Sequence, residues 1–178
     1  MFKKILIALA AVIAVILVVA AFQPADFTVA RSATIDASPA KVFAQVNDLG
    51  NWNNWDPWAK MDPAMKVTFE GPAAGIGASY GWVGNSKVGE GKLTITGSKP
   101  ASEVALRLDF EKPMKDTCNA DFTFKPEGKG TQVTWTMTGK KAYPAKVMCL
   151  FMSMDKMIGG QFEKGLADMK TAAENAKK

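Results

Sequence analysis

The stretch from Pro144 to Lys177 constrains the fold most, because its apolar residues recur at helical spacing along a single stripe. Charged residues such as Lys156, Glu163 and Lys170 lie outside that stripe. A helix of this kind is stable only when its apolar side packs against another part of the fold. We therefore expect one long C-terminal helix that lies across the rest of the domain. The stripe contains Met148, Phe151, Ile158, Phe162, Leu166, Met169 and Ala173.

Two features interrupt this helical pattern. Asp155 lies inside the apolar arc, where it is a solvated residue at a widened edge of the groove, pairs with a basic partner, or provides a polar anchor in a cavity. Gly159 and Gly160 follow in mid-helix, where each glycine costs about 1 kcal/mol relative to alanine. They allow a kink or close approach of the helix to the sheet, and they also leave room for a ligand. Residues 147–152 are apolar on all sides, so we expect this turn to pack under a loop or against a membrane surface.

Upstream of the helix, apolar and polar residues alternate with a period of two, which is typical of strands with one buried face. A first strand is expected from Phe27 to Ile35, although Arg31 breaks its alternation. Short turns between the later strands indicate an antiparallel meander. These strands are expected at Met65–Phe69, Ser79–Val83, Gly91–Thr96, Val104–Phe110, Cys118–Phe124 and Val133–Thr138.

Two short helices are expected between the first strand and the others. Ser38-Pro39 starts the first of them, with serine as the N-cap and proline at the first helical position. In the second, Trp52 and Trp55 lie one turn apart, and Asp56-Pro57 ends the helix. A strongly twisted antiparallel sheet curls, so its covered face is concave and too wide for one helix to fill. The expected fold is α+β, a curved antiparallel sheet of about seven strands with two short helices and the long C-terminal helix.

Residues 5–22 form an uninterrupted apolar run behind Lys3 and Lys4, and as a helix they span about 27 Å, close to the thickness of a bilayer core. The positive flank predicts a single-pass protein of the inner (cell) membrane, with a cytoplasmic N-terminus and a periplasmic or extracellular domain. We divide the chain into a cytoplasmic stub (1–4), a transmembrane signal-anchor helix (5–22), a linker (23–26) and a folded domain (27–178). The alternative is a signal peptide cleaved after Val19-Ala20-Ala21, which leaves a secreted soluble domain.

The composition excludes several kinds of chemistry. The chain has no histidine, so a histidine-based catalytic triad and histidine metal ligands are absent. Its two cysteines, Cys118 and Cys149, are too few for a cysteine-rich zinc site. Residues 77–81 match G-x-S-x-G, but they lie in a strand pattern without a histidine base, so Ser79 is not expected to be a nucleophile. The small, dispersed net charge of +5 argues against nucleic acid. We expect no catalytic residue set, no metal and no cofactor.

Several local motifs resemble those of a known superfamily. The motifs are Val29-Ala30-Arg31-Ser32, Ala37–Phe43, Asn47–Leu49 with Trp52, Trp55–Trp58, Gly130–Trp135 and Phe162–Leu166. Together with the order of elements, they are similar to the helix-grip domain of the SRPBCC superfamily, and to its membrane-anchored bacterial members. That superfamily includes polyketide cyclase/dehydrase-like proteins, START lipid-transfer domains and the birch pollen allergen. The resemblance, over residues 27–170, implies an apolar small molecule held between sheet and C-terminal helix, and it carries over no catalytic residue.

We therefore predict that the chain binds an apolar small molecule or lipid in this cavity, on the outer side of the inner membrane. One alternative is a polyketide cyclase- or dehydratase-like enzyme that uses the cavity as a template, with Asp155 or Tyr80 handling protons. The other is a structural or partner-binding domain with a filled core. The absence of histidine favours binding over catalysis. The candidate cavity residues are Trp55, Trp58, Tyr80, Trp82, Leu106, Phe110, Phe122, Trp135, Phe151, Asp155, Ile158, Gly159 and Phe162.

The anchor and the cleaved signal predict different mature N-termini. If the apolar run is an uncleaved anchor, mass spectrometry of the mature protein will find residues 1–22 attached to the domain. A mature chain that starts at Phe22 would show that the run is a signal peptide.

Overall fold

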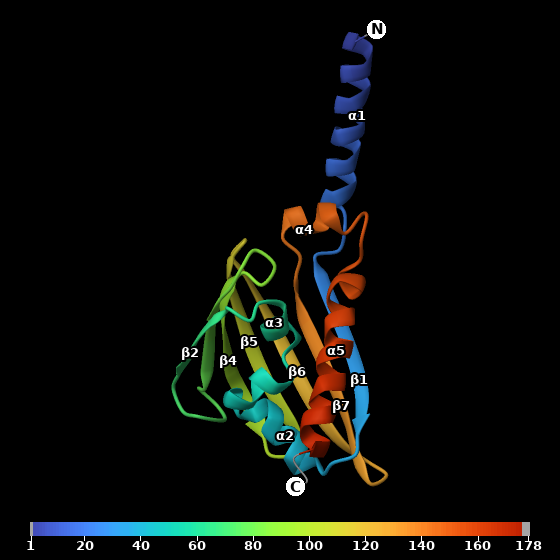
Figure 1. The fold of residues 1–178 in the computed structure, drawn as a ribbon. Coiled ribbons are helices and arrows are strands. Elements are labelled where there is room, and N and C mark those ends of the chain that lie inside the picture. Colours follow the sequence, from blue (N-terminus) through green and yellow to red (C-terminus); the bar gives the residue numbers. More distant parts are fainter. Residues whose placement is uncertain (1, 176–178) are drawn as a thin grey trace.

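The computed structural model describes residues 2–175. An N-terminal helix, α1 (Phe2–Ala21), projects from the folded domain (Figure 1). α1 is long enough and apolar enough to span a membrane, and a signal sequence has the same two properties. Most of the expected stub thus forms the first turn of α1. Met1 and residues 176–178, the outer ends of the expected stub and domain, lie outside the described residues.

One antiparallel sheet of seven strands forms the body of the domain, in the order β1-β7-β6-β5-β4-β3-β2. β2 to β7 pair with their neighbours in sequence, as the short turns predicted, and β1 pairs with β7. The predicted fold class, a curved antiparallel sheet with a long C-terminal helix, is confirmed (Figure 1). The strands are β1 (Asp26–Ile35), β2 (Lys66–Glu70), β3 (Ser79–Val83), β4 (Glu90–Lys99), β5 (Glu103–Lys112), β6 (Asp116–Glu127) and β7 (Gly130–Lys140).

The alternation of residue types decides which side chains face the helices. On β6, Cys118, Ala120 and Phe122 are buried, whereas the residues between them are exposed or half buried. β7 follows the same rule, and its register places Trp135 opposite Phe122. Because successive side chains of a strand point to opposite faces, the buried residues all lie on the concave side of the sheet.

Helices cover the concave side of the sheet. The long helix α5 (Met154–Asn175) lies lengthwise over this face and packs mainly against β1 (Figure 1). The short helix α4 lies at the opposite end of the domain from α2, where it contacts α1. The short helices are α2 (Pro39–Asn47), the 3₁₀ helix η1 (Leu49–Asn54), α3 (Pro57–Met61) and α4 (Tyr143–Met148).

The expected continuous helix from Pro144 is wrong in one respect, because it is interrupted. α4 ends at Met148 and α5 begins at Met154, so residues 149–153 form a connector. The Oγ atom of Ser153 accepts a hydrogen bond from the backbone N–H of Lys156 (3.3 Å), and this serine cap starts a second helix. The apolar pattern concealed the interruption, because Phe151 within the connector keeps helical spacing with Met148 at the end of α4.

The second short helix is also divided. Asp56-Pro57 ends η1, as expected, but it also starts α3. The Asp56 carboxylate accepts a hydrogen bond from the backbone N–H of Trp58 (3.1 Å), and Pro57 occupies the first helical position. The aspartate thus acts as an N-cap, and its side chain is directed into the protein.

Arg31 on β1 explains two irregular residues of the C-terminal helix, Asp155 and Gly159. Its guanidinium forms two hydrogen bonds with the Asp155 carboxylate (2.7 and 2.9 Å) and one with Glu163 (2.7 Å). It lies against the backbone of Gly159, where any Cβ atom would overlap the guanidinium. Bidentate arginine–carboxylate pairs are stronger than single ion pairs, although exposure limits each exposed pair to about 1 kcal/mol. These contacts fix the N-terminal half of α5 on β1.

A second glycine sets the distance between α5 and the sheet. A Cβ atom on Gly165 would lie 2.9 Å from the Trp135 ring and 3.1 Å from Pro57. Gly160, on the same helix, is exposed and has open space at the Cβ position. The close packing of α5 on Trp135 therefore depends on Gly165.

These two glycines form a matched pair for mutation. We expect Gly165→Ala to destabilise the protein by about 1–3 kcal/mol, because the added methyl group overpacks the contact with Trp135. Gly160→Ala will leave stability unchanged or raise it by up to about 1 kcal/mol, because alanine is the better helix former. Urea denaturation of both variants measures the difference, and an equal effect at the two positions would contradict this packing.

Candidate functional site

A cavity of about 400 Å³ lies between the sheet, α3 and the N-terminal half of α5. This volume is within the range of small-molecule binding sites, about 300–1,000 Å³. Met154, Met157 and Ile158 contribute the helical side of its wall. Its aromatic wall comprises Phe27, Trp52, Trp58, Tyr80, Trp82, Phe110 and Trp135.

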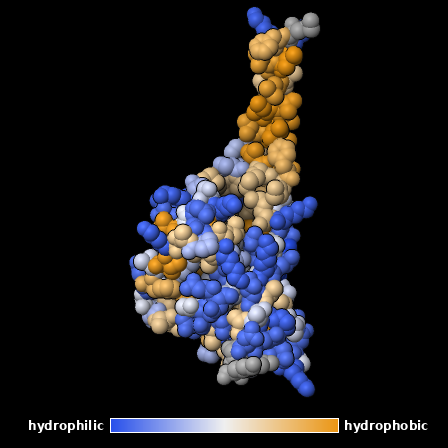
Figure 2. Space-filling view, in the orientation of Figure 1, coloured by the Kyte–Doolittle hydropathy of each residue, from blue (hydrophilic) through white to orange (hydrophobic). Residues whose placement is uncertain are grey.

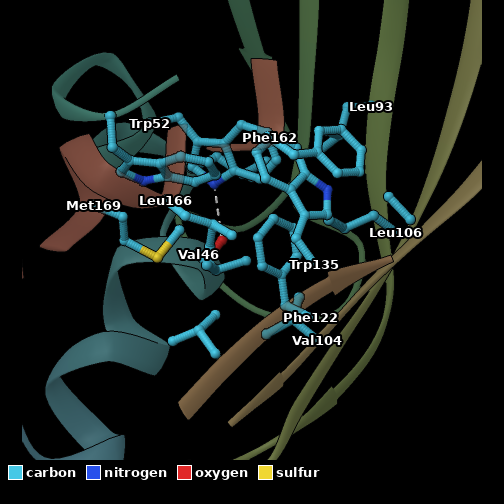
Figure 3. Close-up of a cluster of buried hydrophobic side chains, with 14 of the residues drawn as sticks. Val46, Trp52, Leu93, Val104, Leu106, Phe122, Trp135, Phe162, Leu166 and Met169 are labelled. Carbon is cyan, nitrogen blue, oxygen red and sulfur yellow. Dashed lines mark hydrogen bonds between the residues drawn. The ribbon is translucent and has the colours of Figure 1, made fainter. Parts of the chain in front are cut away.

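The cavity exists because the core fills only part of the concave face. Trp135 stacks on Phe162 of α5, with ring centroids 4.0 Å apart, and on Phe122 of β6 at 4.8 Å (Figure 3). Trp55 packs edge-on against both Phe122 and Trp135. On the α2 side of this stack, α5 and α2 fill the face with Leu166, Met169 and other buried side chains (Figure 3). On the α4 side, the face stays open.

The η1 segment is held rigidly over the filled part. The indole N–H of Trp52 donates to the carbonyl oxygen of Val46 (2.9 Å), and that of Trp55 donates to Gln45 (2.9 Å). Both partners lie at the end of α2, where backbone carbonyls have no helical partner. The two tryptophans are therefore fixed, and Trp52 contributes one wall of the cavity.

The structure brings six of the predicted cavity residues to its wall: Trp58, Tyr80, Trp82, Phe110, Trp135 and Ile158. Four others, Trp55, Leu106, Phe122 and Phe162, are almost completely buried in the filled core and do not line the cavity. Each of them lies on the buried face of its element, as predicted, but at a position along that element where the core is filled.

Three predicted residues lie away from the cavity. Asp155 and Gly159 lie on the side of α5 that faces Arg31, and the Asp155 side chain is 55% exposed. Arg31 holds the pKa of the Asp155 carboxyl below its usual value, mainly through the hydrogen bonds between them. Phe151 lies in the connector and is 76% exposed, because the chain is not helical there. The ion-pair interpretation of Asp155 is the one that the geometry supports.

The cavity also contains residues that sequence reasoning missed. Leu93, Leu108 and Met137 line it from the strands, and their alternation was a signal that could have identified them. Residues 86–89 and 112–116 line it from two loops, which have no periodic signal. Asp56 lines it as well, and an aspartate before a proline looks like an ordinary turn residue.

Asp56 is the acidic group inside this apolar wall, and only 5% of its surface is exposed. Burial raises the pKa of its carboxyl to about 6, against the opposing effect of backbone N–H groups of Trp58 and Ala59. Burial, together with the charge of Asp56, raises the pKa of the Tyr80 hydroxyl, so the tyrosine stays protonated. Tyr80 Oη and Trp135 Nε1 have no hydrogen-bond partner among the described residues. The wall therefore combines a large apolar area with a few polar atoms.

The remaining reactive side chains do not form a familiar catalytic site. Ser79 lies at the start of strand β3, and its hydroxyl donates to the backbone carbonyl oxygen of Glu70 (3.3 Å). Burial raises the pKa of the Cys118 thiol to about 11, which keeps it protonated and unreactive. Within residues 2–175, no three His, Cys, Asp or Glu side chains come together in a way that could hold a metal ion.

A curved antiparallel sheet that holds a long C-terminal helix over an apolar cavity defines the helix-grip class of ligand-binding folds. The chain belongs to the family described as polyketide cyclase/dehydrase and lipid transport, whose model matches residues 26–174. This confirms the predicted superfamily. No curated protein sequence matches the chain.

Solved structures show the same fold at low sequence identity. The Aha1 dimer from Colwellia psychrerythraea is 17% identical, with a TM-score of 0.60 over 85% of this chain and 99% of that one. The protein Ara h 8.0201 is 11% identical, with a TM-score of 0.57 over 84% of this chain and 99% of that one. DynU16, from the dynemicin biosynthetic locus, is 14% identical, with a TM-score of 0.57 over 84% of this chain and 48% of its own. These similarities define the fold alone.

The raised pKa of Asp56 predicts a pH-dependent stability. Because the folded-state pKa is about 6 and the ordinary value is 3.8, folding favours the protonated acid. The stabilisation is complete below the ordinary pKa and is lost as the pH rises through about 6. Wild type should therefore lose up to roughly 3 kcal/mol of unfolding free energy across this range that Asp56→Asn does not lose.

Asparagine is the matched replacement, because it preserves the N-cap and does not titrate. Urea unfolding of both proteins at several pH values between the two pKa values gives the comparison. Parallel pH profiles would show that the Asp56 carboxyl titrates normally.

Proposed function

We propose that this protein binds an apolar small molecule or lipid in the cavity between its sheet and α5, while α1 anchors it to a membrane. The observation that carries the proposal is the cavity of about 400 Å³ with its aromatic wall, beside an otherwise tightly packed core. At a coarse level, the family description of polyketide cyclase/dehydrase and lipid transport supports hydrophobic ligand binding.

Apolar burial supplies enough free energy for such binding. A ligand that buries about 300 Å² of apolar surface gains roughly 7 kcal/mol, before the entropic costs of association. Polar atoms in the wall can add specificity, because Tyr80 Oη and Trp135 Nε1 are hydrogen-bond donors that have no partner within residues 2–175. The geometry therefore favours a mainly apolar ligand that carries an oxygen acceptor.

The membrane location rests on α1 and on its basic N-terminal flank, Lys3 and Lys4. Such a flank stays in the cytoplasm, so the domain would face the periplasm or the cell exterior. Lipids and other apolar molecules are concentrated in the adjoining bilayer. An anchored binding domain would take up its ligand there.

A second candidate function is catalysis in the same cavity. Asp56 favours it, since a buried carboxyl with a pKa of about 6 beside the Tyr80 hydroxyl can exchange a proton near neutral pH. Asp155, one of the two acid–base groups considered from the sequence, lies outside the cavity and pairs with Arg31. If a substrate is converted, Asp56→Asn will abolish conversion, whereas in a binding protein it will only change affinity.

The binding proposal is tested by filling the cavity. Ile158→Trp places an indole into the cavity from α5, so it should weaken binding of a dansyl-labelled fatty acid at least about tenfold, a loss of roughly 1.4 kcal/mol. Its melting temperature should stay within a few degrees of wild type, because open space accepts the larger side chain. Fluorescence titration and thermal unfolding of the full chain in amphipol measure both quantities.

Lys164→Trp is the matched control, because it adds the same side chain to an exposed position of α5. It should bind the probe like wild type. Failure of wild type to bind any apolar probe, together with a large fall in the melting temperature of Ile158→Trp, would favour a filled core and a structural role.

A further inference from the structure

The cavity opens at one end of the domain. Its rim is drawn from three connections: residues 86–89 between β3 and β4, residues 112–116 between β5 and β6, and residues 141–142 between β7 and α4, together with Ala145 of α4. Most of these residues are exposed, whereas the walls further in are buried. We call this rim the cavity mouth. All three connections lie at the end of the sheet where α4 meets α1 (Figure 1).

The chain leaves α1 at the same end. α1 ends at Ala21 and β1 begins at Asp26, so residues 22–25 can span at most about 14 Å. The backbone N–H of Lys141, on the rim, donates to the carbonyl oxygen of Ala25 in this linker (2.7 Å). The Tyr143 hydroxyl donates to the carbonyl oxygen of Leu17 (2.7 Å). A membrane that contains α1 must therefore lie close to the cavity mouth.

The side chains around the mouth suit a membrane surface. Phe151 and Met152 in the connector are 76% and 49% exposed, and Met148 and Met114 are also exposed. The apolar surface of α1 continues onto the adjoining part of the domain (Figure 2). Exposed apolar side chains of this kind insert at the boundary between headgroups and acyl chains.

The charges at the mouth are mainly basic. Lys87, Lys112, Lys115 and Lys141 line it, and Asp116 is the acidic residue among the described rim residues. Lys112 pairs with Glu90 and Lys115 with Glu111, whereas Lys87 and Lys141 form no ion pair within residues 2–175. Lysines close to a membrane surface attract anionic phospholipid headgroups.

We propose that the cavity mouth docks onto the bilayer that α1 anchors, with the connector inserted among the lipids and Lys87 and Lys141 against anionic phospholipid headgroups. The ligand then enters the cavity from the membrane, without crossing bulk water. This proposal rests on the proposed function for the identity of the cavity as a binding site, but docking can be measured without any ligand.

A membrane fits the mouth better than an acidic protein partner does. The four-residue linker keeps the start of β1 within about 14 Å of the end of α1, so a protein partner would have to enter the narrow space between the domain and the bilayer. The apolar connector follows α4, which contacts the apolar helix α1, as expected for a surface that meets lipid. We therefore regard a protein partner as an outcome of the test.

Docking is measured with a fluorophore on Cys149, which lies at the start of the connector and is the more accessible of the two cysteines. The full chain is reconstituted into phosphatidylcholine vesicles with phosphatidylglycerol, and quenching by spin-labelled lipids reports the depth of the label. The control label is placed on Lys129→Cys in a Cys149→Ser chain, at the opposite end of the sheet. We expect strong quenching at Cys149 and none at position 129; no quenching at either position overturns the proposal.

Loading is measured as the rise of tryptophan-to-dansyl energy transfer after mixing the reconstituted chain with vesicles that carry a dansyl-labelled fatty acid. Phe151→Ser with Met152→Ser should slow loading about tenfold or more, but leave the equilibrium affinity in amphipol unchanged, because neither residue lines the cavity. Lys87→Glu with Lys141→Glu should remove the dependence on phosphatidylglycerol, about fivefold for each lysine. Lys129→Glu should change neither quantity.

The outcomes separate the two proposals. If wild type fails to bind the probe in amphipol but Cys149 is quenched, docking stands and the proposed function fails. If wild type binds the probe but Cys149 is not quenched and the connector variant loads normally, the domain loads from water and the docking proposal fails. Shielding of Cys149 only when another protein is added would point to a protein partner and would also overturn it.

Discussion

The stacking of Trp135 on Phe162 decides which part of the concave face is filled core and which part is cavity. It joins the centre of the sheet to the middle of α5, at a ring separation of 4.0 Å that only a glycine at position 165 permits. One helix cannot fill the concave face of a seven-stranded sheet, so the position of this contact determines where the remaining space lies. On one side the short helices close the core, and on the other side the cavity is left open.

On the open side of the Trp135–Phe162 stack, α5 is held on the sheet by polar contacts. There, Arg31 binds Asp155 and Glu163 from the outer edge of the sheet, and the Gly159 backbone makes room for its guanidinium. These polar contacts lie outside the cavity wall, so they position α5 without filling the space beneath it. An apolar contact between the sheet and the inner side of α5 would instead occupy the volume of the cavity. The contacts of Arg31 with α5 therefore hold the helix in place and leave the cavity open.

The cavity mouth and the apolar helix α1 meet at one end of the fold. This follows from chain connectivity, because β1 starts within a few residues of α1 and pairs with β7, whose end leads into α4. The connector, the rim lysines and the linker thus come together although they are far apart in sequence. A binding cavity that faces its own membrane would need no aqueous transfer step for a poorly soluble ligand.

The sequence by itself determined the strand count, the antiparallel order, the long C-terminal helix and the apolar N-terminal run, because each depends on local periodicity or length. It also determined which face of each strand is buried. The sequence could not determine which residues of that face fill the core and which line the cavity. Phe122 and Phe162 fill the core, whereas Trp82 and Phe110 line the cavity, although all four have the same pattern. The difference depends on where elements distant in sequence meet. For the same reason only the tertiary structure decided the partner of Arg31, the burial of Asp56 and the contribution of three connections to the cavity mouth.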